Sequence, residues 1–354
     1  MTASPADVLL APAGRDGGRA VPTGRVSLGE RLFSGGMKGA AIGVAAILVG
    51  VLVFLGVRGV PAMFAGEGGL PAHATSFWQL AGPLAFGSLW VAVIALVFAA
   101  LPAVGVALAA TVYAPNPRFG RFLAAVLDLL AAVPSVVFGL WGLMVLAPVA
   151  TPIYAWLHQH LGWLPLFAGE PSVTGRTVLT AGMVVGVMIL PIMAAMCRES
   201  FALTPPALME AATALGATRW EMVRTTVLPG ARSGIVAGGM LGLGRALGET
   251  MAVAMVLSAT PFLISFNVIS SENPATIAAF IASTFPESTG SQVGALIGLG
   301  LVLFGISLVA SVAGRRIAQG GLNNQSARQD KSGSGRRAAR RQLGRSPAPE
   351  GGAA

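Results

Sequence analysis

Long apolar stretches are the feature of this sequence that most constrains its fold. Six of them, each of about 18 residues or more with few or no charges, lie at residues 39–57, 86–112, 122–150, 177–197, 233–257 and 291–313. Only 10% of the residues are charged, whereas soluble globular proteins carry about 25%. So few charges cannot cover a water-facing surface, which excludes a soluble enzyme and a disordered regulator. We therefore predict an all-α integral membrane protein with six transmembrane helices, located as a multi-pass protein in the cell (inner or plasma) membrane.

The basic residues predict the orientation of these helices. If the N-terminus is cytoplasmic, 20 of the 23 lysines and arginines fall on the cytoplasmic side, and only Arg58 and Arg176 fall outside. Arg245 lies within a span. This asymmetry follows the positive-inside rule and places both termini in the cytoplasm. The net charge of +9 is thereby explained by topology and attraction to the lipid bilayer, and no nucleic-acid partner is expected.

Two polar tails flank the spans. Residues 1–38 and 314–354 are rich in small and polar residues, and the second is also strongly basic. Such composition is typical of disordered segments. We predict two cytoplasmic, disordered tails.

The sequence contains no pattern for catalysis. Neither lysine, Lys38 or Lys331, ends a phosphate-binding G-x-x-x-x-G-K-[ST] loop. The single cysteine, Cys197, excludes a CxxC site. We expect no catalytic residues, no metal and no cofactor, and therefore no enzyme activity of the chain by itself.

Three ionisable residues lie inside the apolar stretches, and their presence there needs an explanation. Each costs about 2.5–3.5 kcal/mol at the centre of a bilayer. Arg245 and Glu249 are four residues apart and would share one face of the fifth span. They either form an ion pair that locks helix packing or line a polar path in which Arg245 attracts an anion. We expect Asp128, near the cytoplasmic end of its span, to be solvated.

The fifth span also carries regularly spaced glycines. Gly234, Gly238 and Gly242 follow an i, i+4 spacing, as do Gly244 and Gly248. Rows of this kind permit close contact between membrane helices. We therefore expect both rows to pack against other helices.

The loop 198–232 is the one sizeable cytoplasmic loop between spans, and it has helix start and stop signals. Thr204 before two prolines predicts a helix start, and Gly216 predicts its end. Thr218 and Glu221 form a capping box that predicts a second helix. A helix–turn–helix at this position indicates a docking element rather than a mere connection.

This loop resembles the EAA loop of ABC importer permeases. The matching residues are Glu210, Ala211, Ala212, Gly216, Leu228 and Pro229. Segments 134–142, 232–237, 244–253 and 276–282 are similar to the phosphate-specific permeases. Of these, the stretches 138–142 and 248–253 favour the PstC type over its PstA-type partner. The resemblance covers residues 39–316. Thr226 departs from the pattern, which usually has an aliphatic residue there.

The resemblance implies a type I ABC importer permease (MetI-like) fold and a role in phosphate import. A family member pairs with a PstA-like permease subunit, with two copies of an ATP-binding subunit and with an extracytoplasmic phosphate-binding protein. It translocates inorganic phosphate by alternating access, while the separate subunit hydrolyses ATP. The EAA loop would couple ATP hydrolysis to phosphate translocation. Within the outside segment 258–290, Asn273-Pro274 would start a short apolar helix on the membrane surface or against the binding protein.

Other functions remain open from the residues alone. A permease for sulfate or molybdate has the same composition. A proton-coupled carrier would use Asp128 and Glu249 as a relay, although it needs no EAA loop. A membrane scaffold would keep Arg245 and Glu249 only as a packing pair.

Overall fold

The structure is a computed structural model that describes residues 28–64, 70–114 and 116–343. The chain divides into two units, one up to Val53 and one from Phe54 onward. The first unit contains the N-terminal part of helix α1 (Leu28–Met63). The rest of α1 and all the other helices and strands belong to the second unit.

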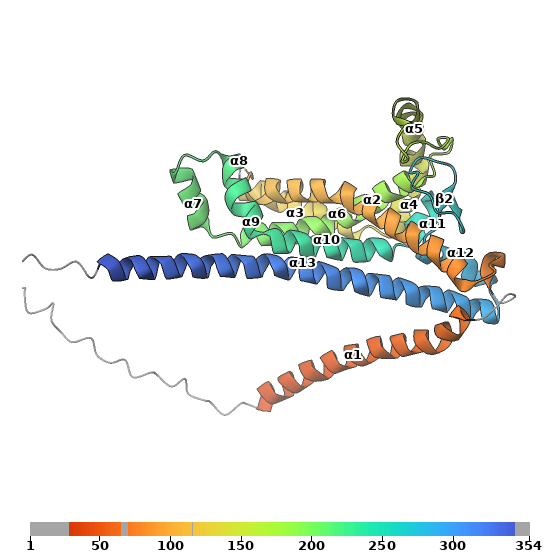
Figure 1. The fold of residues 1–354 in the computed structure, drawn as a ribbon, viewed down its shortest axis with the longest axis horizontal. Helices are drawn as coiled ribbons and strands as arrows, with labels where there is room; N and C mark the ends of the chain where they lie inside the picture. The colour runs from red at the N-terminus through yellow and green to blue at the C-terminus, as the bar shows by residue number, and fades with distance from the viewer. Residues whose placement is uncertain (1–27, 65–69, 115, 344–354) are drawn as a thin grey trace, which may run out of the picture. The chain divides into compact units, whose positions relative to one another are not determined.

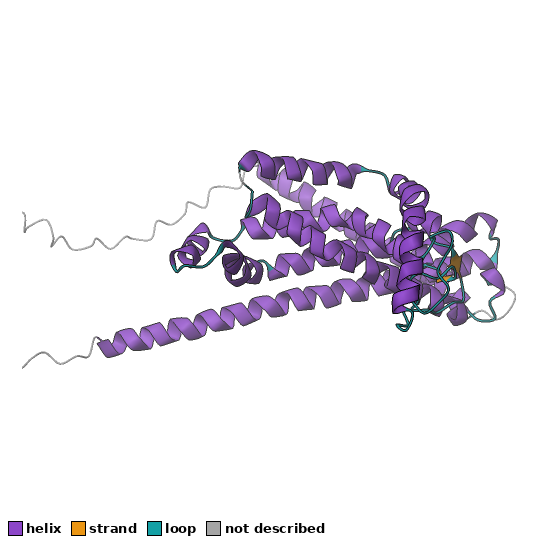
Figure 2. Cartoon of the chain, turned by 90° about the horizontal axis from the view of Figure 1, so that it is seen from above, coloured by secondary structure: helices purple, strands orange, loops and turns teal. Residues whose placement is uncertain are grey.

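The second unit is built almost wholly from helices (Figures 1 and 2). Its longer helices are α2 (Phe77–Thr111), α3 (Pro117–Ala132), α5 (Ala147–Leu161), α6 (Val178–Ala202), α10 (Arg232–Leu247) and α13 (Ser291–Leu343). The shorter ones are α4 (Ser135–Trp141), α7 (Pro206–Ala214), α8 (Arg219–Met222), α9 (Leu228–Gly230), α11 (Met251–Val256) and α12 (Ile277–Thr284). Two π-helical segments (Gly142–Leu146, Val223–Val227), two 3-10 turns (Pro71–His73, Phe285–Glu287) and two short parallel strands, β1 (Ala259–Thr260) and β2 (Asn273–Pro274), complete it.

The core of this unit lies where α2, α6 and α10 run side by side (Figure 1). A Cβ atom added at Gly182 of α6 would clash with Ile94 of α2, and one added at Gly186 would press against the Ala95 carbonyl. The facing alanines of α2 are fully buried. Because lipid is as apolar as leucine, close packing of small residues is what holds membrane helices together.

Five helices in the described part of the chain are long and apolar enough to cross a membrane. They are Leu32–Met63, Phe77–Thr111, Ser135–Leu161, Val178–Ala202 and Ser291–Ile317. Four contain or overlap closely the spans predicted at 39–57, 86–112, 177–197 and 291–313. The predicted integral membrane class and helical fold are confirmed, and the spans at 122–150 and 233–257 differ from the prediction.

The third predicted span is interrupted at Val133 and Pro134. Val133 has extended dihedrals, φ −67° and ψ 129°, and ends α3. A residue before proline is driven out of the helical region by the proline ring. The apolar run 122–150 is therefore divided between α3 and a second helical segment from Ser135 to Leu161. Hydropathy alone did not show this break.

The fifth predicted span is also divided. Helix α10 ends at Leu247, Gly248 is its C-cap, and α11 begins at Met251. Glu249 Oε1 accepts a hydrogen bond from the Ala252 backbone N–H at 3.1 Å, which supplies the start of α11 with an acceptor. Glycine favours this stop because a helix interior costs glycine about 1 kcal/mol relative to alanine.

The tails differ from the disorder prediction wherever they are described. Residues 28–38 belong to α1, and residues 314–343 continue α13 beyond the predicted end of the last span. Residues 1–27 and 344–354 lie outside the described residues. Arginine, alanine and glutamine in the 314–343 segment are good helix formers, and the prediction gave this propensity too little weight.

Helix α12 lies in the interior rather than on the membrane surface, where it was expected. Asn273-Pro274 forms strand β2, and the helix begins later, after the N-cap Thr276. The Ile277 backbone N–H donates to Ser88 Oγ of α2 at 2.8 Å. Ile277 and Phe280 are buried beside Leu84 of α2. Because Ile277 and Phe280 pack against α2, they cannot contact lipid or a partner protein.

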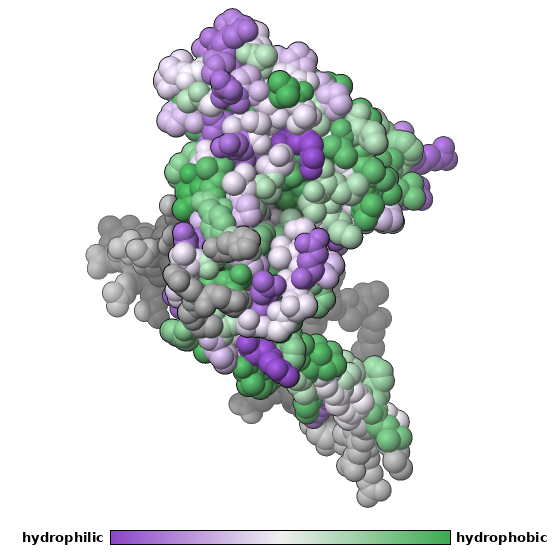
Figure 3. All heavy atoms as spheres, turned by 90° about the vertical axis from the view of Figure 1, so that its right-hand side faces the viewer, coloured by the Kyte–Doolittle hydropathy of each residue, from purple (hydrophilic) through white to green (hydrophobic). Residues whose placement is uncertain are grey.

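At this end of the unit, buried Asn273 joins the 257–276 segment to the loop that leads into α6. Its Oδ1 accepts from the Val178 N–H at the start of α6 at 3.0 Å. Its Nδ2 shares two N–H groups among the carbonyl oxygens of Arg176, Ser258 and Ser271, at 3.1, 3.1 and 3.2 Å. Figure 3 shows that hydrophilic and hydrophobic residues are interspersed on the face at the right-hand side of Figure 1.

We predict that Asn273→Leu lowers the free energy of unfolding by about 3 kcal/mol or more, because each buried polar group left unpaired costs about 1–3 kcal/mol. The measurement is thermal or denaturant unfolding of the purified protein in detergent. Glu272→Ala, next in sequence but exposed, is the matched control and should stay within about 0.5 kcal/mol of wild type. Equal stability of the Asn273 variant would contradict the role assigned to this side chain.

Candidate functional site

The predicted helix–turn–helix is present in the loop that follows α6. Helix α7 contains Glu210, Ala211 and Ala212, and a turn at Gly216 leads to α8. The expected N-cap is wrong: Pro205 occupies that position without a side-chain bond, and Thr204 is buried beside it. Leu228 and Pro229 lie in α9, directly before α10.

A small apolar core fixes this module to the transmembrane helices. Val223, Val227 and Met222 of the module pack with Ala107 and Leu108 of α2 and with Cys197 and Phe201 of α6. Met209, Ala212 and Leu228 contact the same core from its edge. A displacement of the module therefore moves the C-terminal ends of α2 and α6 with it.

Local hydrogen bonds fix the shape of the turn. Gly216 has a φ of +87°, in the region that side chains rarely adopt. The capping box is complete: Thr218 Oγ1 accepts from the Glu221 N–H at 3.3 Å, and Glu221 Oε2 accepts from the Thr218 N–H at 2.8 Å. The bonds from the Thr218 backbone and hydroxyl lower the pKa of the Glu221 carboxyl.

The outer side of the module presents apolar and acidic groups to solvent. Leu215, Trp220 and Leu208 are 90%, 56% and 55% exposed. Glu210 is exposed, and its carboxylate has no hydrogen bond or ion pair with any described residue. Exposed large side chains grouped on one projecting element are typical of a protein-binding surface.

We predict that Gly216→Ala destabilises the α7–α8 turn by about 1–2 kcal/mol, because alanine in the left-handed region carries a penalty of that size. Its added Cβ would meet nothing within 4 Å, so the cost comes from the backbone alone. Gly216→Asn is the matched variant and should cost less, since asparagine tolerates this region. Hydrogen exchange across residues 205–222 reports the effect. Equal protection in alanine and asparagine variants would contradict it.

Arg245 and Glu249 do not form the pair that their spacing predicted. They are separated by the helix end at Gly248, and within the described residues no ion pair joins them. Glu249 is half-buried and caps α11, whereas Arg245 is exposed on α10. The structure of this chain thus provides no ion pair that locks packing, and it leaves the guanidinium of Arg245 accessible.

The glycines of α10 separate into two faces. Added Cβ atoms at Gly234, Gly238 and Gly242 would collide with Ser200, Met196 and Met193 of α6, which confirms close packing of this row. Gly244 has open space at the position of a Cβ. It lies beside Arg245 on the face that α6 does not cover, so the second expected row packs against nothing close within the described residues at that position.

Asp128 is exposed in the last two turns of α3. It lies in the C-terminal half of α3, and its exposure leaves the expectation that it is solvated as a prediction. Asp128 and Glu249 share no hydrogen bond in the described structure.

Sequence reasoning overlooked Arg176, which it counted only as an outside charge. The residue is half-buried beside the C-terminal end of α11, and its Nη2 donates to the Leu257 carbonyl at 3.4 Å. Its buried Nε has no partner among the described residues. Only the fold brings the 162–177 loop to α11, so no local sequence signal could have shown this position.

Comparison with known proteins agrees with this architecture. Residues 102–320 match the family model of the binding-protein-dependent transport system inner membrane component. The chain is 43% identical to the phosphate transport system permease protein PstC 2 of Mycobacterium tuberculosis over 83% of this chain and 93% of that protein. It is 42% identical to PstC of Mycobacterium leprae over 77% of this chain and 87% of that protein.

A solved structure of the MetNI methionine ABC transporter, in an inward-facing conformation, matches with a TM-score of 0.49 and 17% identity, over 69% of this chain and 96% of that one. The family model, which covers more than half of the chain, identifies the helical membrane domain as a transporter permease. The chain belongs to the family of binding-protein-dependent transport system inner membrane components and, within it, to the phosphate transport system permeases of the PstC type.

Proposed function

We propose that this chain is one half of the membrane permease of an ATP-driven importer that carries inorganic phosphate into the cytoplasm by alternating access. Identity of 43% to a PstC permease across 83% of the chain is the observation that carries this proposal. This identity favours phosphate as the substrate over sulfate or molybdate, whereas the amino-acid composition does not distinguish among the three anions.

The partners follow from the family and from the exposed surfaces. Two ATP-binding subunits hydrolyse ATP on the side of the α7–α8 module, which docks on them, and an extracytoplasmic binding protein delivers phosphate at the opposite end. A PstA-like subunit supplies the second half of the permease. The open face of α10, which includes Gly244 and Arg245, fits a position against that second half.

The orientation proposed is cytoplasmic for both termini. The 113–121 loop and the end of α6 meet in one pocket, lined by Asn116, Arg121 and Arg198. Both loops predicted to be cytoplasmic therefore lie at one end of the unit, together with α7 and α8. Their positive charge supports placing this end in the cytoplasm.

Transport is tested in proteoliposomes that contain this chain, the PstA-like subunit and the ATP-binding subunit, with the binding protein outside. We expect radiolabelled phosphate uptake that requires ATP inside the proteoliposomes and is unaffected by a protonophore. Excess sulfate or molybdate should not compete. Uptake driven by a proton gradient without ATP would instead favour the carrier with Asp128 and Glu249 as relay.

Coupling through the module is tested by Glu210→Arg. The reversed charge on the exposed face of α7 should abolish uptake and ATP hydrolysis stimulated by phosphate, while abundance stays near wild type, because this carboxylate has no partner within the chain. Glu199→Arg, an exposed charge reversal at the end of α6, is the control and should retain most uptake. Wild-type uptake by Glu210→Arg would show that α7 is not the coupling element.

Arg245 is proposed to meet the anion during translocation. Arg245→Met should assemble normally, because the side chain is exposed and bonds to no described residue, and should lose phosphate uptake by at least tenfold. Arg245→Lys keeps the charge without the planar fork and should retain part of the activity. Glu249→Gln, which retains an oxygen that can cap α11, separates the charge of Glu249 from its capping role. Wild-type uptake by Arg245→Met would exclude Arg245 from the path.

A further inference from the structure

A pocket of about 570 Å³ lies at the end of the unit that carries α7 and α8. It is lined by the end of α2, the start of α3 and the end of α6, among them Thr111, Asn116, Arg121 and Arg198. None of its lining residues is acidic. The phosphate path proposed above uses α10 and does not pass through this pocket.

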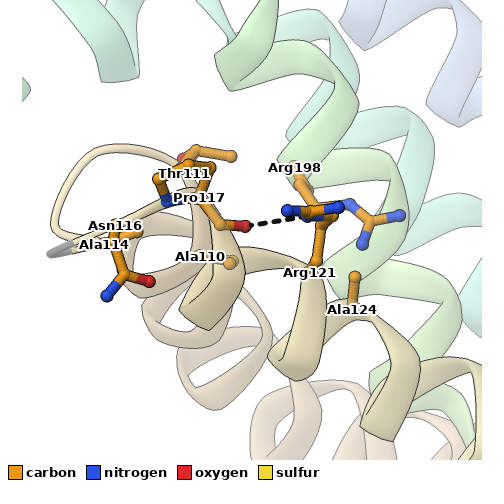
Figure 4. A pocket seen from close by; sticks show the side chains of 9 residues that line it. Ala110, Thr111, Ala114, Asn116, Pro117, Arg121, Ala124 and Arg198 are labelled. Carbon is orange, nitrogen blue, oxygen red and sulfur yellow. Dashed lines mark hydrogen bonds between the residues drawn. The ribbon is translucent and has the colours of Figure 1, made fainter.

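Two arginine side chains form the wall of the pocket. Arg121 Nε donates to the Pro117 carbonyl in the first turn of α3 at 3.3 Å, which fixes the direction of the guanidinium (Figure 4). Its terminal nitrogens, and all guanidinium nitrogens of half-buried Arg198, have no hydrogen-bond partner among the described residues. Two cations that line one pocket without a counter-charge repel each other unless an anion binds between them.

No carboxylate in the described structure offsets these charges. Asp128, one turn beyond Ala124 on α3, does not line the pocket and forms no ion pair with either arginine. Glu199 follows Arg198 in α6 and is exposed without lining it. Within residues 28–64, 70–114 and 116–343, the two guanidinium groups thus have no counter-charge.

The side chains around the pocket indicate which kind of anion it binds. Paired guanidinium groups match the oxygens of a phosphate group through parallel hydrogen bonds. Phe119 and Phe122, on the same helix as Arg121, are 42% and 64% exposed, as aromatic side chains at a membrane–water interface are. Basic pockets between helices on the cytoplasmic side of a membrane suit phosphate headgroups.

We propose that Arg121 and Arg198 bind a phosphate-bearing anion in this pocket, either the headgroup of an anionic phospholipid or free inorganic phosphate. The site is separate from the translocation path and is occupied from the cytoplasmic side. When bound, the anion ties the start of α3 to the end of α6, one residue beyond Cys197 in the core that holds the coupling module.

The test uses the assembled transporter in a zwitterionic detergent. Phosphatidylglycerol, phosphatidylcholine and inorganic phosphate are titrated separately, and binding is followed by native mass spectrometry. We expect phosphatidylglycerol to bind at least tenfold more tightly than phosphatidylcholine. Arg121→Gln with Arg198→Gln should weaken that binding about thirtyfold, since each cationic side chain near a membrane surface contributes roughly a factor of five. If the double variant instead weakens the binding of inorganic phosphate, the ligand of the pocket is the free phosphate ion.

Matched single variants separate a built site from general positive charge. Arg121→Gln and Arg118→Gln each remove one charge from the first turns of α3, but Arg118 does not line the pocket. Only Arg121→Gln should weaken binding by about fivefold or more. If the double glutamine variant fails to assemble, Arg121→Lys with Arg198→Lys preserves charge and should bind within about tenfold of wild type. Equal losses for Arg118→Gln and Arg121→Gln, or no loss of either probe in the double variant, would overturn the proposal.

Discussion

The close contact between α2 and α6 is the interaction on which the rest of the structure depends. Glycines of α6 meet α2 where a Cβ would collide, and alanines of α2 are buried opposite them. In a membrane, association gains little from removing apolar surface from water, so this steric fit supplies the stability. Helix α10 packs on α6 in the same manner with the roles exchanged: its own glycines Gly234, Gly238 and Gly242 meet Ser200, Met196 and Met193 of α6.

Both candidate functional regions, the α7–α8 module and α10, pack against α6. At its C-terminal end, Cys197 and Phe201 belong to the core that anchors the α7–α8 module. Along its length, Met193 and Met196 meet the glycines of α10 and leave the opposite face, with Arg245, uncovered. A motion of the module is therefore transmitted to α10 through packed side chains rather than through a flexible linker, as a rigid-body mechanism of alternating access requires.

The break between α10 and α11 places a charge next to backbone groups that need acceptors. Glu249 caps α11 within a largely apolar region. Capping gives this carboxylate a structural reason for its position, whereas Arg245 has none within the chain. The two ionisable residues that looked equivalent in sequence thus have different surroundings: Glu249 caps the start of α11, and Arg245 is exposed without a partner among the described residues, which is why we propose it for contact with the anion.

The sequence by itself determined the membrane class, the projecting helix–turn–helix with its Gly216 turn and capping box, and the glycine row of α10 that meets α6. Each depends on local propensity or on spacing along one helix, which a single sequence contains. Pro134 is itself a local signal for the break that ends α3, although hydropathy passes over it. Only the tertiary structure decided the break at Gly248, the interior position of α12, and the meeting of Arg121 with Arg198. Hydropathy averaged over a window cannot detect a helix end that is compensated by a nearby cap, and residues 77 positions apart become neighbours only when α2, α3 and α6 pack together.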